Sequence, residues 1–316
     1  MDTVAHVAVE IPFVPPLDEV HYGVAEQVSP LIRRIIANNP SKYSYRGTGT
    51  YIVGEAGGDV VVIDPGPKLD EHRDALVAAL AGQHVRVILV THCHADHSPL
   101  AAWLREETGA PTIAFGPHGA VDLDEDEETD VKVEEAIDLA FAPDIYAVDG
   151  DVVAEIGGAP MRAVFTPGHT SNHMCFSLEA ERALFTGDHV MGWSTTVVSP
   201  PDGDMRAYMD SLAKVAARDD VTLWPTHGNP VTDPKPFLDA YLAHRVEREA
   251  QVLSRVRAGD TQIADMVKVL YADVREELHK AAGRSVFSHL VKLVDDGQVR
   301  VAGDTPPTLK STYTAS

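Results

Sequence analysis

Four metal-ligating side chains follow directly on a β-branched segment, and this cluster constrains the fold more than any other feature of the chain. Residues 85–90 read VRVILV, and the next seven, THCHADH, contain His92, His94, Asp96 and His97. Imidazole nitrogens and carboxylate oxygens are the ligands that zinc and similar divalent ions take in proteins. A lone histidine is more often a satisfied polar group, but four such side chains in a purely structural role would compete for few partners. The motif therefore predicts a metal site in a tight loop at the end of a strand.

Three later segments repeat a pattern of an apolar strand, a Gly or Pro bend and one ligand-type side chain. VFTPGH ends at His169, ALFTGD ends at Asp188 and TLWPTH ends at His227. Two metal ions need more ligands than the first cluster supplies. Side chains at the carboxyl ends of several strands are typical of sites in α/β folds. We therefore expect these three residues to complete the metal site.

In their order and spacing, these residues resemble the metallo-β-lactamase superfamily, and the resemblance covers about residues 45–235. It implies an αββα sandwich that holds two zinc ions. His92, His94 and His169 would hold one ion, and Asp96, His97 and His227 the second, with Asp188 bridging them. Iron or manganese would also suit this set of ligands. The Gly-Gly pair that usually follows the histidine cluster is replaced here by Ser98-Pro99, which affects the expected loop shape rather than the ligands.

A narrower resemblance extends over more of the chain. The stretches NNP at 38–40, GTGTYIVG at 47–54, FTPGHTSNHM at 165–174, STTVV at 194–198 and YMDSL at 208–212 look like the β-lactamase-like-protein branch with a C-terminal winged helix. That branch has endoribonuclease members and is similar to thioesterases that release acyl groups from carrier proteins. The resemblance implies a catalytic domain over residues 1–235, a connecting helix over 236–258 and a winged-helix-like tail over 259–316.

Hydrophobic periodicity places the motifs on alternating strands and helices, as an α/β fold requires. Strands are predicted over 51–54, 59–64, 151–156, 160–165, 173–178 and 183–187, and helices over 69–81, 99–107, 204–218 and 237–258. Pro230, Pro234 and Pro236 are expected to mark the boundary before the last helix. In the superfamily an aspartate at the position of Asp64 commonly supports the metal loop, so Asp64 either lies behind the ligands or is a simple turn residue.

The tail is predicted to contain three short helices and a hairpin, as in a winged helix. The first two helices would cover about residues 263–270 and 274–278, and the third would extend from Ser285 to about residue 294. The wing would pair residues around Leu293 with residues 299–301.

Charge argues against long nucleic acids as partners. Residues 1–244 contain 15 Lys and Arg against 38 Asp and Glu, whereas residues 245–316 contain 11 against 10, which gives the net charge of −22. Since Lys and Arg contacts with phosphate supply most non-specific affinity, RNA would need a local basic strip. Arg245, Arg248, Arg255 and Arg257 offer one, but their interleaving with glutamates favours a salt-bridged solvent face. The tail is then better explained as a lid, a packing module or a homodimer contact than as a nucleic-acid reader.

Size and composition suit an enzyme kept in a reducing compartment. The 316 residues, 44% of them hydrophobic, can bury a large core and a small second one. Residues 1–20 contain no export signal and no apolar stretch is long enough for a membrane span, so we expect a cytoplasmic protein without membrane contact. Cys93 and Cys175 are expected to be buried thiols rather than reactive ones. The run at 122–130, with seven acidic residues in nine, is expected to be a solvated loop.

The expected ligands indicate a hydrolytic mechanism, but they do not identify the substrate. Two zinc ions would lower the pKa of a bridging water from about 16 towards 7 and create a hydroxide nucleophile, which Asp96 can orient. No Ser or Cys nucleophile motif competes with this mechanism. A proton for the leaving group would come from metal-bound water, from His173 or from His189, although both histidines are better explained as structural residues behind the ligands.

Three functions remain open for such a site. The favoured one is hydrolysis of a small or carrier-bound acyl ester, thioester or lactone, and the alternative is cleavage of single-stranded RNA phosphodiesters. A zinc-binding regulatory protein without turnover is disfavoured because all seven ligands are present. A narrow apolar pocket would favour the acyl substrate, and a basic groove leading to the metals would favour RNA. Antibiotic lactams are disfavoured, because an export signal is missing and the tail would cover part of the mouth.

Overall fold

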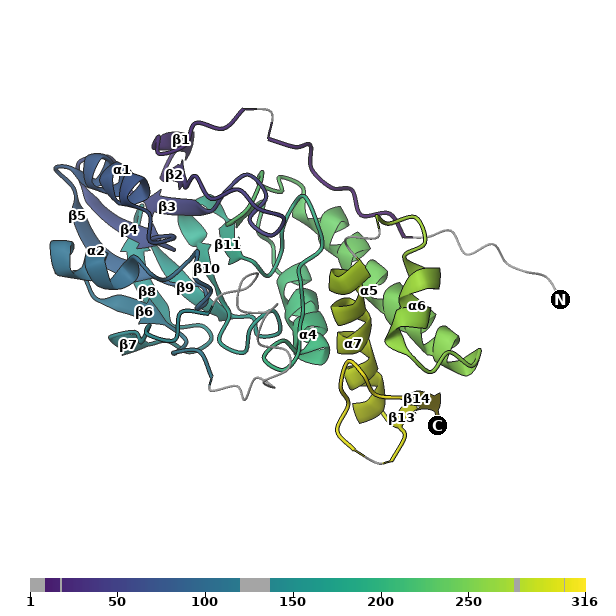
Figure 1. Cartoon of the computed structure of the whole chain (residues 1–316). Helices are drawn as coiled ribbons and strands as arrows, with labels where there is room; N and C mark the ends of the chain where they lie inside the picture. The colour runs from purple at the N-terminus through teal and green to yellow at the C-terminus, as the bar shows by residue number, and fades with distance from the viewer. Residues whose placement is uncertain (1–8, 18, 120–136, 276–278, 304) are drawn as a thin grey trace.

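The computed structural model describes residues 9–17, 19–119, 137–275, 279–303 and 305–316 (Figure 1). The acidic run at 122–130 lies outside the described residues. Among the residues that are described, none belongs to a helix that is long and apolar enough to cross a lipid bilayer.

Two β-sheets form the centre of the protein. The first has the strand order β1 (Glu26–Ser29), β2 (Ile32–Ile36), β3 (Gly49–Val53), β4 (Asp59–Ile63), β5 (His84–Leu89), β6 (Thr112–Ala114), β7 (Ile145–Tyr146). Its first four strands pair antiparallel, whereas β4 to β7 pair parallel. The second has the order β12 (Thr222–Pro225), β11 (Ala183–Gly187), β10 (Met174–Leu178), β9 (Ala159–Phe165), β8 (Val152–Ile156). Here β11 and β12 pair parallel, and the other neighbours pair antiparallel.

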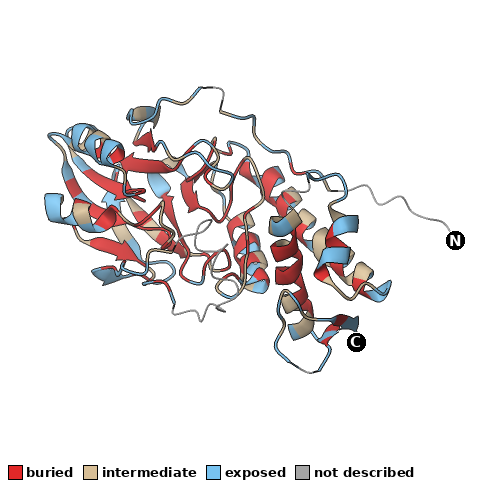
Figure 2. Cartoon of the chain, in the orientation of Figure 1, coloured by how far each residue is buried: buried red, intermediate tan, exposed pale blue. Residues whose placement is uncertain are grey.

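Apolar side chains fill the space between the sheets and cover their outer faces. Tyr51 and Phe185 belong to the cluster between the two sheets. On the outer face of the first sheet, α1 (Asp70–Leu80) and α2 (Ala101–Thr108) bury Leu76 and Leu104. On the outer face of the second, α4 (Met205–Ala216) and α5 (Pro234–Arg257) bury their apolar sides. Figure 2 shows the buried residues concentrated in the strands and on the inward sides of these helices. This layering confirms the predicted αββα sandwich.

The predicted helices and strands of this part lie within a few residues of their expected bounds. The expected hairpin is formed by β3 and β4, and a short 3₁₀ helix, η2 (Glu179–Glu181), joins β10 to β11. α4 begins after Asp204, whose carboxylate accepts a hydrogen bond from Ala207 N (2.9 Å), as an N-cap residue does. The strands β1, β2, β6 and β7 were not predicted. Pro234 and Pro236 lie in the first turn of α5 rather than before it, because a missing backbone N–H is tolerated there.

The tail builds its own small core on the second half of α5. It consists of α6 (Ile263–Leu270), α7 (His279–Asp295) and the hairpin of β13 (Val299–Val301) with β14 (Tyr313–Ala315). Val252 and Val256 of α5 pack into this core, whereas Phe237 and Tyr241 of the same helix pack into the catalytic part. One helix therefore belongs to two cores. The division at residues 235 and 258 stays a prediction.

Two details of the tail differ from the expectations, while the second short helix, expected over residues 274–278, lies largely outside the described residues. Ser285 lies inside α7, which has already begun at His279. Leu293 is helical, and β13 pairs with residues 313–315 instead. The wing is therefore closed by a strand from the end of the chain.

Arg245 also departs from its predicted place on a salt-bridged solvent face. Its side chain is buried, with 3% exposed, and its guanidinium lies over the rings of Tyr208 and Tyr241. Its Nη2 donates a hydrogen bond to Thr196 O (2.5 Å). The charge pattern along α5 could not reveal this, because α4 and the loop over residues 194–198 cover that side of the helix. Arg255, by contrast, pairs with a carboxylate, although this is Asp260 (2.6 Å) and not one of the interleaved glutamates.

Candidate active site

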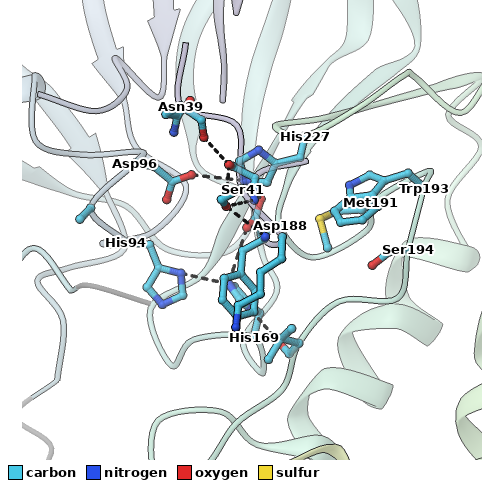
Figure 3. Close-up of a pocket in the computed structure, with 15 residues that line it drawn as sticks. Asn39, Ser41, His94, Asp96, His169, Asp188, Met191, Trp193, Ser194 and His227 are labelled. Atoms are coloured by element: carbon cyan, nitrogen blue, oxygen red, sulfur yellow. Dashed lines mark hydrogen bonds and ion pairs between the residues drawn. The ribbon is translucent and has the colours of Figure 1, made fainter. Parts of the chain in front are cut away.

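The seven predicted ligands leave strand ends at one edge of the sandwich. The loop with the first four follows β5, His169 lies between β9 and β10, Asp188 follows β11 and His227 follows β12. Because β4 and β5 are parallel, and β11 and β12 are too, the carboxyl ends of each pair meet at one edge. Backbone hydrogen bonds join the two sheets there, from Met174 N to Thr91 O (2.8 Å) and from Gly49 N to Thr226 O (2.8 Å). The structure thus brings all seven side chains together, and Figure 3 shows five of them, His94, Asp96, His169, Asp188 and His227.

Three imidazole nitrogens converge in one half of this cluster. His92 Nε2 lies 3.0 Å from His94 Nδ1, and His169 Nε2 lies 3.2 Å from the same atom. The ligand atoms of the three residues lie within 4.8 Å of one another. Such a triangle of nitrogens at a strand end is the donor set that a divalent cation requires.

Two imidazoles and two carboxylates make up the other half. His97 Nε2 lies 3.4 Å from Asp96 Oδ1, and His227 Nε2 lies 3.3 Å from Asp96 Oδ2. Asp188 Oδ1 lies 3.4 Å from His227 Nε2, and its Oδ2 lies 3.7 Å from His97 Nε2. The same Oδ2 is 3.9 Å from His169 Nε2 in the first half. The Asp188 carboxylate therefore lies between the two halves.

Hydrogen bonds on the far side of the rings set the orientation of the histidines. The acceptors of the Nδ1 protons are Asp64 Oδ2 for His97 (2.9 Å), Val197 O for His169 (2.7 Å) and Gly47 O for His227 (3.2 Å). A proton on Nδ1 leaves the lone pair of Nε2 pointing at the cluster. Metal-ligating histidines are held in this way by acceptors behind them.

Asp64 lies behind the cluster and serves two of its histidines. Its Oδ2 accepts hydrogen bonds from His97 Nδ1 (2.9 Å) and from Thr91 Oγ1 (2.8 Å), and its Oδ1 accepts from Thr91 N (2.8 Å). Since the Thr91 hydroxyl gives its proton to Asp64, it accepts the Nδ1 proton of His92 (3.0 Å). Asp64 therefore has the contacts of a residue that supports the metal loop.

The electrostatics of the two halves differ. Burial, together with the neighbouring histidines, lowers the pKa of His92 well below its usual value and that of His94 to about 3. Burial would do the same to His97 and His227, but the carboxylates of Asp188 and Asp96 outweigh it. They raise the pKa of His97 well above its usual value and that of His227 to about 10. Positive charge is thus favoured beside the two carboxylates. In the first half the imidazoles of His92 and His94 stay neutral, so their nitrogen lone pairs are available to a cation.

Two buried polar atoms without a hydrogen-bond partner among the described residues indicate that the cluster can bind cations. His97 Nε2 and Asp188 Oδ1 are buried, and neither has a hydrogen-bond partner among the described residues. Leaving a buried polar atom unpaired costs about 1–3 kcal/mol, which a coordinated cation would offset. Imidazole and carboxylate donors suit zinc, iron and manganese.

His173 and His189 are both buried behind the ligands. His173 Nε2 accepts a hydrogen bond from Asp188 N (3.3 Å), and its Nδ1 lies 2.9 Å from Thr166 Oγ1. The His189 ring packs on Tyr208, with ring centroids 5.0 Å apart. Its nitrogens have no hydrogen-bond partner among the residues that the structure describes. Neither histidine is among the described residues that line the site cavity.

Cys93 points away from the ligands on either side of it, as alternation along the chain predicts. Its Sγ accepts a hydrogen bond from Asn172 Nδ2 (2.9 Å) and lies 3.7 Å from Gly116 O. Burial raises the pKa of the Cys93 thiol to about 12, so it is not a thiolate at neutral pH. Cys175 is fully buried in β10.

Two residues that hold Asp96 escaped the sequence analysis. Thr48 Oγ1 donates a hydrogen bond to Asp96 Oδ2 (2.7 Å) and accepts one from Asn39 Nδ2 (2.8 Å). Asn39 Oδ1 accepts in turn from Thr48 N (2.9 Å). Both residues belong to stretches that carried the family resemblance. Nothing in their local sequence, however, indicates a contact with Asp96, which lies 48 positions after Thr48.

The cluster lies at the base of a cavity of about 240 Å³. His94, Asp96 and His169 line one side, and Met191 and Trp193 lie on the opposite side (Figure 3). The Trp193 ring stacks on that of Tyr45, with centroids 4.7 Å apart. The cavity therefore combines groups that could bind a metal ion with an apolar wall.

Comparisons with known proteins agree over most of the chain. Residues 46–227 match the family model described as the metallo-beta-lactamase superfamily, and residues 263–306 match the beta-lactamase associated winged helix domain. The beta-lactamase-like protein 2 homolog of Caenorhabditis elegans is 30% identical over 283 residues, which cover 88% of this chain and 89% of that protein.

A second relative has a name that specifies a reaction. The atrochrysone carboxyl ACP thioesterase of Aspergillus chevalieri is 30% identical over 299 residues, which cover 90% of this chain and 86% of that protein. Among solved structures, a beta-lactamase domain protein from Burkholderia ambifaria superposes with a TM-score of 0.76 at 21% identity, covering 94% of this chain and 95% of that one. That structure supports the fold alone.

Proposed function

Because the chain belongs to the metallo-beta-lactamase superfamily of hydrolases, we propose that it cleaves acyl thioesters in a site that holds two zinc ions. The thioesterase relative, similar over nearly the whole chain, supports this choice among acyl substrates. The apolar wall of Met191 and Trp193 beside the ligands supports it as well, since an acyl chain needs an apolar surface.

The proposed ligands follow the two halves of the cluster. His92, His94 and His169 would hold one ion, and Asp96, His97 and His227 would hold the other, with Asp188 between them. Ions bound there lower the pKa of a bound water towards neutrality and polarise the scissile carbonyl. The short distances within each half and the orphaned atoms of His97 and Asp188 support this assignment.

The residues around the ligands fix the positions that this chemistry needs. Thr48 holds the Asp96 carboxylate towards the cavity, where it can accept a hydrogen bond from the attacking water. Asp64 and Val197 keep the rings of His97 and His169 turned to the cluster. Small displacements of such groups are costly, because reaction rates depend steeply on geometry.

A thioester also suits a site in which neither candidate histidine can give a proton to the leaving group. His173 and His189 are buried away from the cavity, so neither can protonate a leaving group directly. A thiol has a pKa of about 8.5 and leaves readily as a thiolate, whereas an alcohol needs a proton. We therefore propose that the leaving thiolate takes its proton from solvent, and that the two histidines only position their neighbours.

Cleavage of single-stranded RNA is the second candidate, and one observation favours it. A cleft with basic side chains adjoins the site cavity. The net charge of −22 weighs against it, because the chain as a whole repels polyanions. The buried, unpaired cysteines are in keeping with the reducing conditions of the cytoplasm, where both substrates occur.

A parallel assay tests the proposal. The full chain, loaded separately with zinc, iron or manganese, is offered an acyl thioester, a lactone and a fluorescent single-stranded RNA, with His94→Ala as control. We expect the thioester to be hydrolysed fastest, with most activity on zinc, and the variant to be inactive on every substrate. Preferential cleavage of RNA, or full activity in His94→Ala, would overturn the proposal.

A further inference from the structure

A second cleft adjoins the site cavity at the junction with the tail. It has a volume of about 410 Å³ and lies between the loop at residues 194–198 and the first turns of α7. Its walls and those of the site cavity share Lys42, Tyr43, Ser194 and Val197. α7 packs against α4 and α5 here (Figure 1). A long substrate can therefore reach from the metal ligands into this cleft.

The described lining of the cleft is basic, in contrast to the rest of the chain. It includes Lys42, Arg245, Lys280 and Arg284, and no acidic residue is found among its described lining residues. The chain as a whole has 48 acidic residues against 26 basic ones. Four basic side chains around one cleft are a local exception in such a protein, and among the described lining residues they favour an anionic ligand.

Arg284 shows most directly that the cleft is built for an anion. Its side chain lines the cleft and is only 9% exposed. Among the described residues it has no hydrogen-bond or ion-pair partner. Charged side chains are rarely buried without a partner, because removing the charge from water is costly. A ligand with oxygen acceptors would satisfy this guanidinium.

Arg245 adds a second buried positive charge. Its neighbours are the Thr196 carbonyl and the rings of Tyr208 and Tyr241, and no carboxylate pairs with it within the part of the chain that is described. Its charge is thus stabilised by dipoles and π-faces but not neutralised. The buried basic side chains of the cleft therefore extend from α7 to α5.

We infer that the cleft binds the phosphate of a phosphopantetheine arm whose acyl thioester lies at the metal ligands. This inference rests on the proposed thioesterase function and names the form in which the substrate arrives. Coenzyme A and acyl carrier proteins both present their thioester at one end of this arm and a phosphate at the other. The planar guanidinium of Arg284 matches phosphate oxygens. The adjoining cavities then hold the two ends of one molecule.

The cleft suits a single phosphate better than an RNA strand. Its cations are gathered around one cleft between two parts of the chain, rather than along a strip that follows a backbone. The acidic remainder of the protein would repel the phosphates beyond it. Binding of RNA in this cleft is therefore the outcome that would contradict the inference.

Two matched substrates test the inference by turnover. Acyl-phosphopantetheine and acyl-pantetheine differ only in the phosphate, and kcat/KM for each is measured with the metal-loaded full chain. We expect the phosphorylated substrate to be preferred about tenfold or more, mainly through KM. In Arg284→Gln the ratio should fall towards one, whereas in Arg300→Gln, on the exposed wing, it should stay as in the wild type. Equal rates on both substrates in the wild type would overturn the inference while leaving the thioesterase proposal intact.

Binding measured by calorimetry tests the cleft independently of turnover. Phosphopantetheine should bind the wild type more tightly than pantetheine, and Lys280→Gln should reduce this difference without a risk to folding, since Lys280 is exposed. If no thioester is hydrolysed but this difference persists, the function fails and the phosphate site stands. If single-stranded RNA binds in an Arg284-dependent way and phosphopantetheine does not, the inference is wrong. Acyl-coenzyme A and an acylated carrier protein, compared in the same assay, separate the two sources of the arm.

Discussion

Replacing Asp64 by Asn tests whether the residue behind the ligands sets the metal affinity. Its Oδ2 accepts from His97 Nδ1 and Thr91 Oγ1, and its Oδ1 accepts from Thr91 N. A carboxylate satisfies all of these donors, but an amide has only one oxygen. In Asp64→Asn the amide NH₂ would therefore face a donor, either the backbone N–H of Thr91 or the ring of His97. In the second case His97 moves its proton to Nε2, the atom that points at the cluster.

The expected size of the effect follows from these contacts. Loss of a partner behind a metal-ligating histidine weakens metal binding about 10–100-fold, which equals about 1.4–2.7 kcal/mol. A buried donor left unpaired costs a further ~1–3 kcal/mol of folding free energy. The backbone adds little, because Asn tolerates the positive φ of 49° that Asp64 adopts. The loss should fall on the half of the cluster that contains His97.

Competition with a chelator of known affinity measures both binding steps. We expect one ion to bind about 10–100-fold more weakly in Asp64→Asn while the other keeps its affinity within a few-fold. Asp59→Asn is the matched control, since Asp59 lies exposed at the start of the strand that leads to Asp64 and should leave both steps unchanged. Wild-type affinity for both ions in Asp64→Asn would refute the reasoning.

Three further changes test other parts of the structure. Removing the metal with a chelator should lower the melting temperature in calorimetry, and zinc should restore it, because the buried ligand atoms lose a partner; an unchanged melt would contradict the metal site. In Gly168→Ala a Cβ at φ 132° would overlap the backbone of Tyr208, so both stability and metal content should fall, and normal values would contradict the geometry. Cys93 and Cys175 are buried, so neither should react with a thiol reagent before unfolding; rapid labelling of the native protein would contradict this.

The fold and the clustering of the seven candidate ligands were predictable because their signals are local. Each ligand follows directly on an apolar run such as residues 85–90, and the family resemblance supplied the way in which the strands pair. β2 escaped because Arg33 and Arg34 interrupt its apolar pattern. Both arginines are buried, and each donates a hydrogen bond to a distant group, Arg33 to Gln83 Oε1 (2.6 Å) and Arg34 to Gly228 O (2.9 Å). Local sequence does not report such long-range partners.

The surroundings of the site were less predictable for the same reason. Thr48 reaches Asp96 across 48 residues, and Arg245 reaches Thr196 across 49. The wing strand β14 pairs with β13 although residues 302–312 separate the two strands. In each case tertiary packing brings together two partners that are far apart in the sequence. The charge pattern on α5 even favoured the opposite placement for Arg245.

The loop at residues 194–198 lies between the candidate metal ligands and the cleft beside the tail. Its Val197 carbonyl orients His169, while the same loop forms the floor of the cleft whose far wall is α7. Substitutions in α7 can therefore alter which molecules enter without touching any group that performs the hydrolysis. Proteins that retain these seven side chains can therefore change their substrate specificity through substitutions in the tail. Relatives that catalyse the same type of reaction can then differ widely in their substrates.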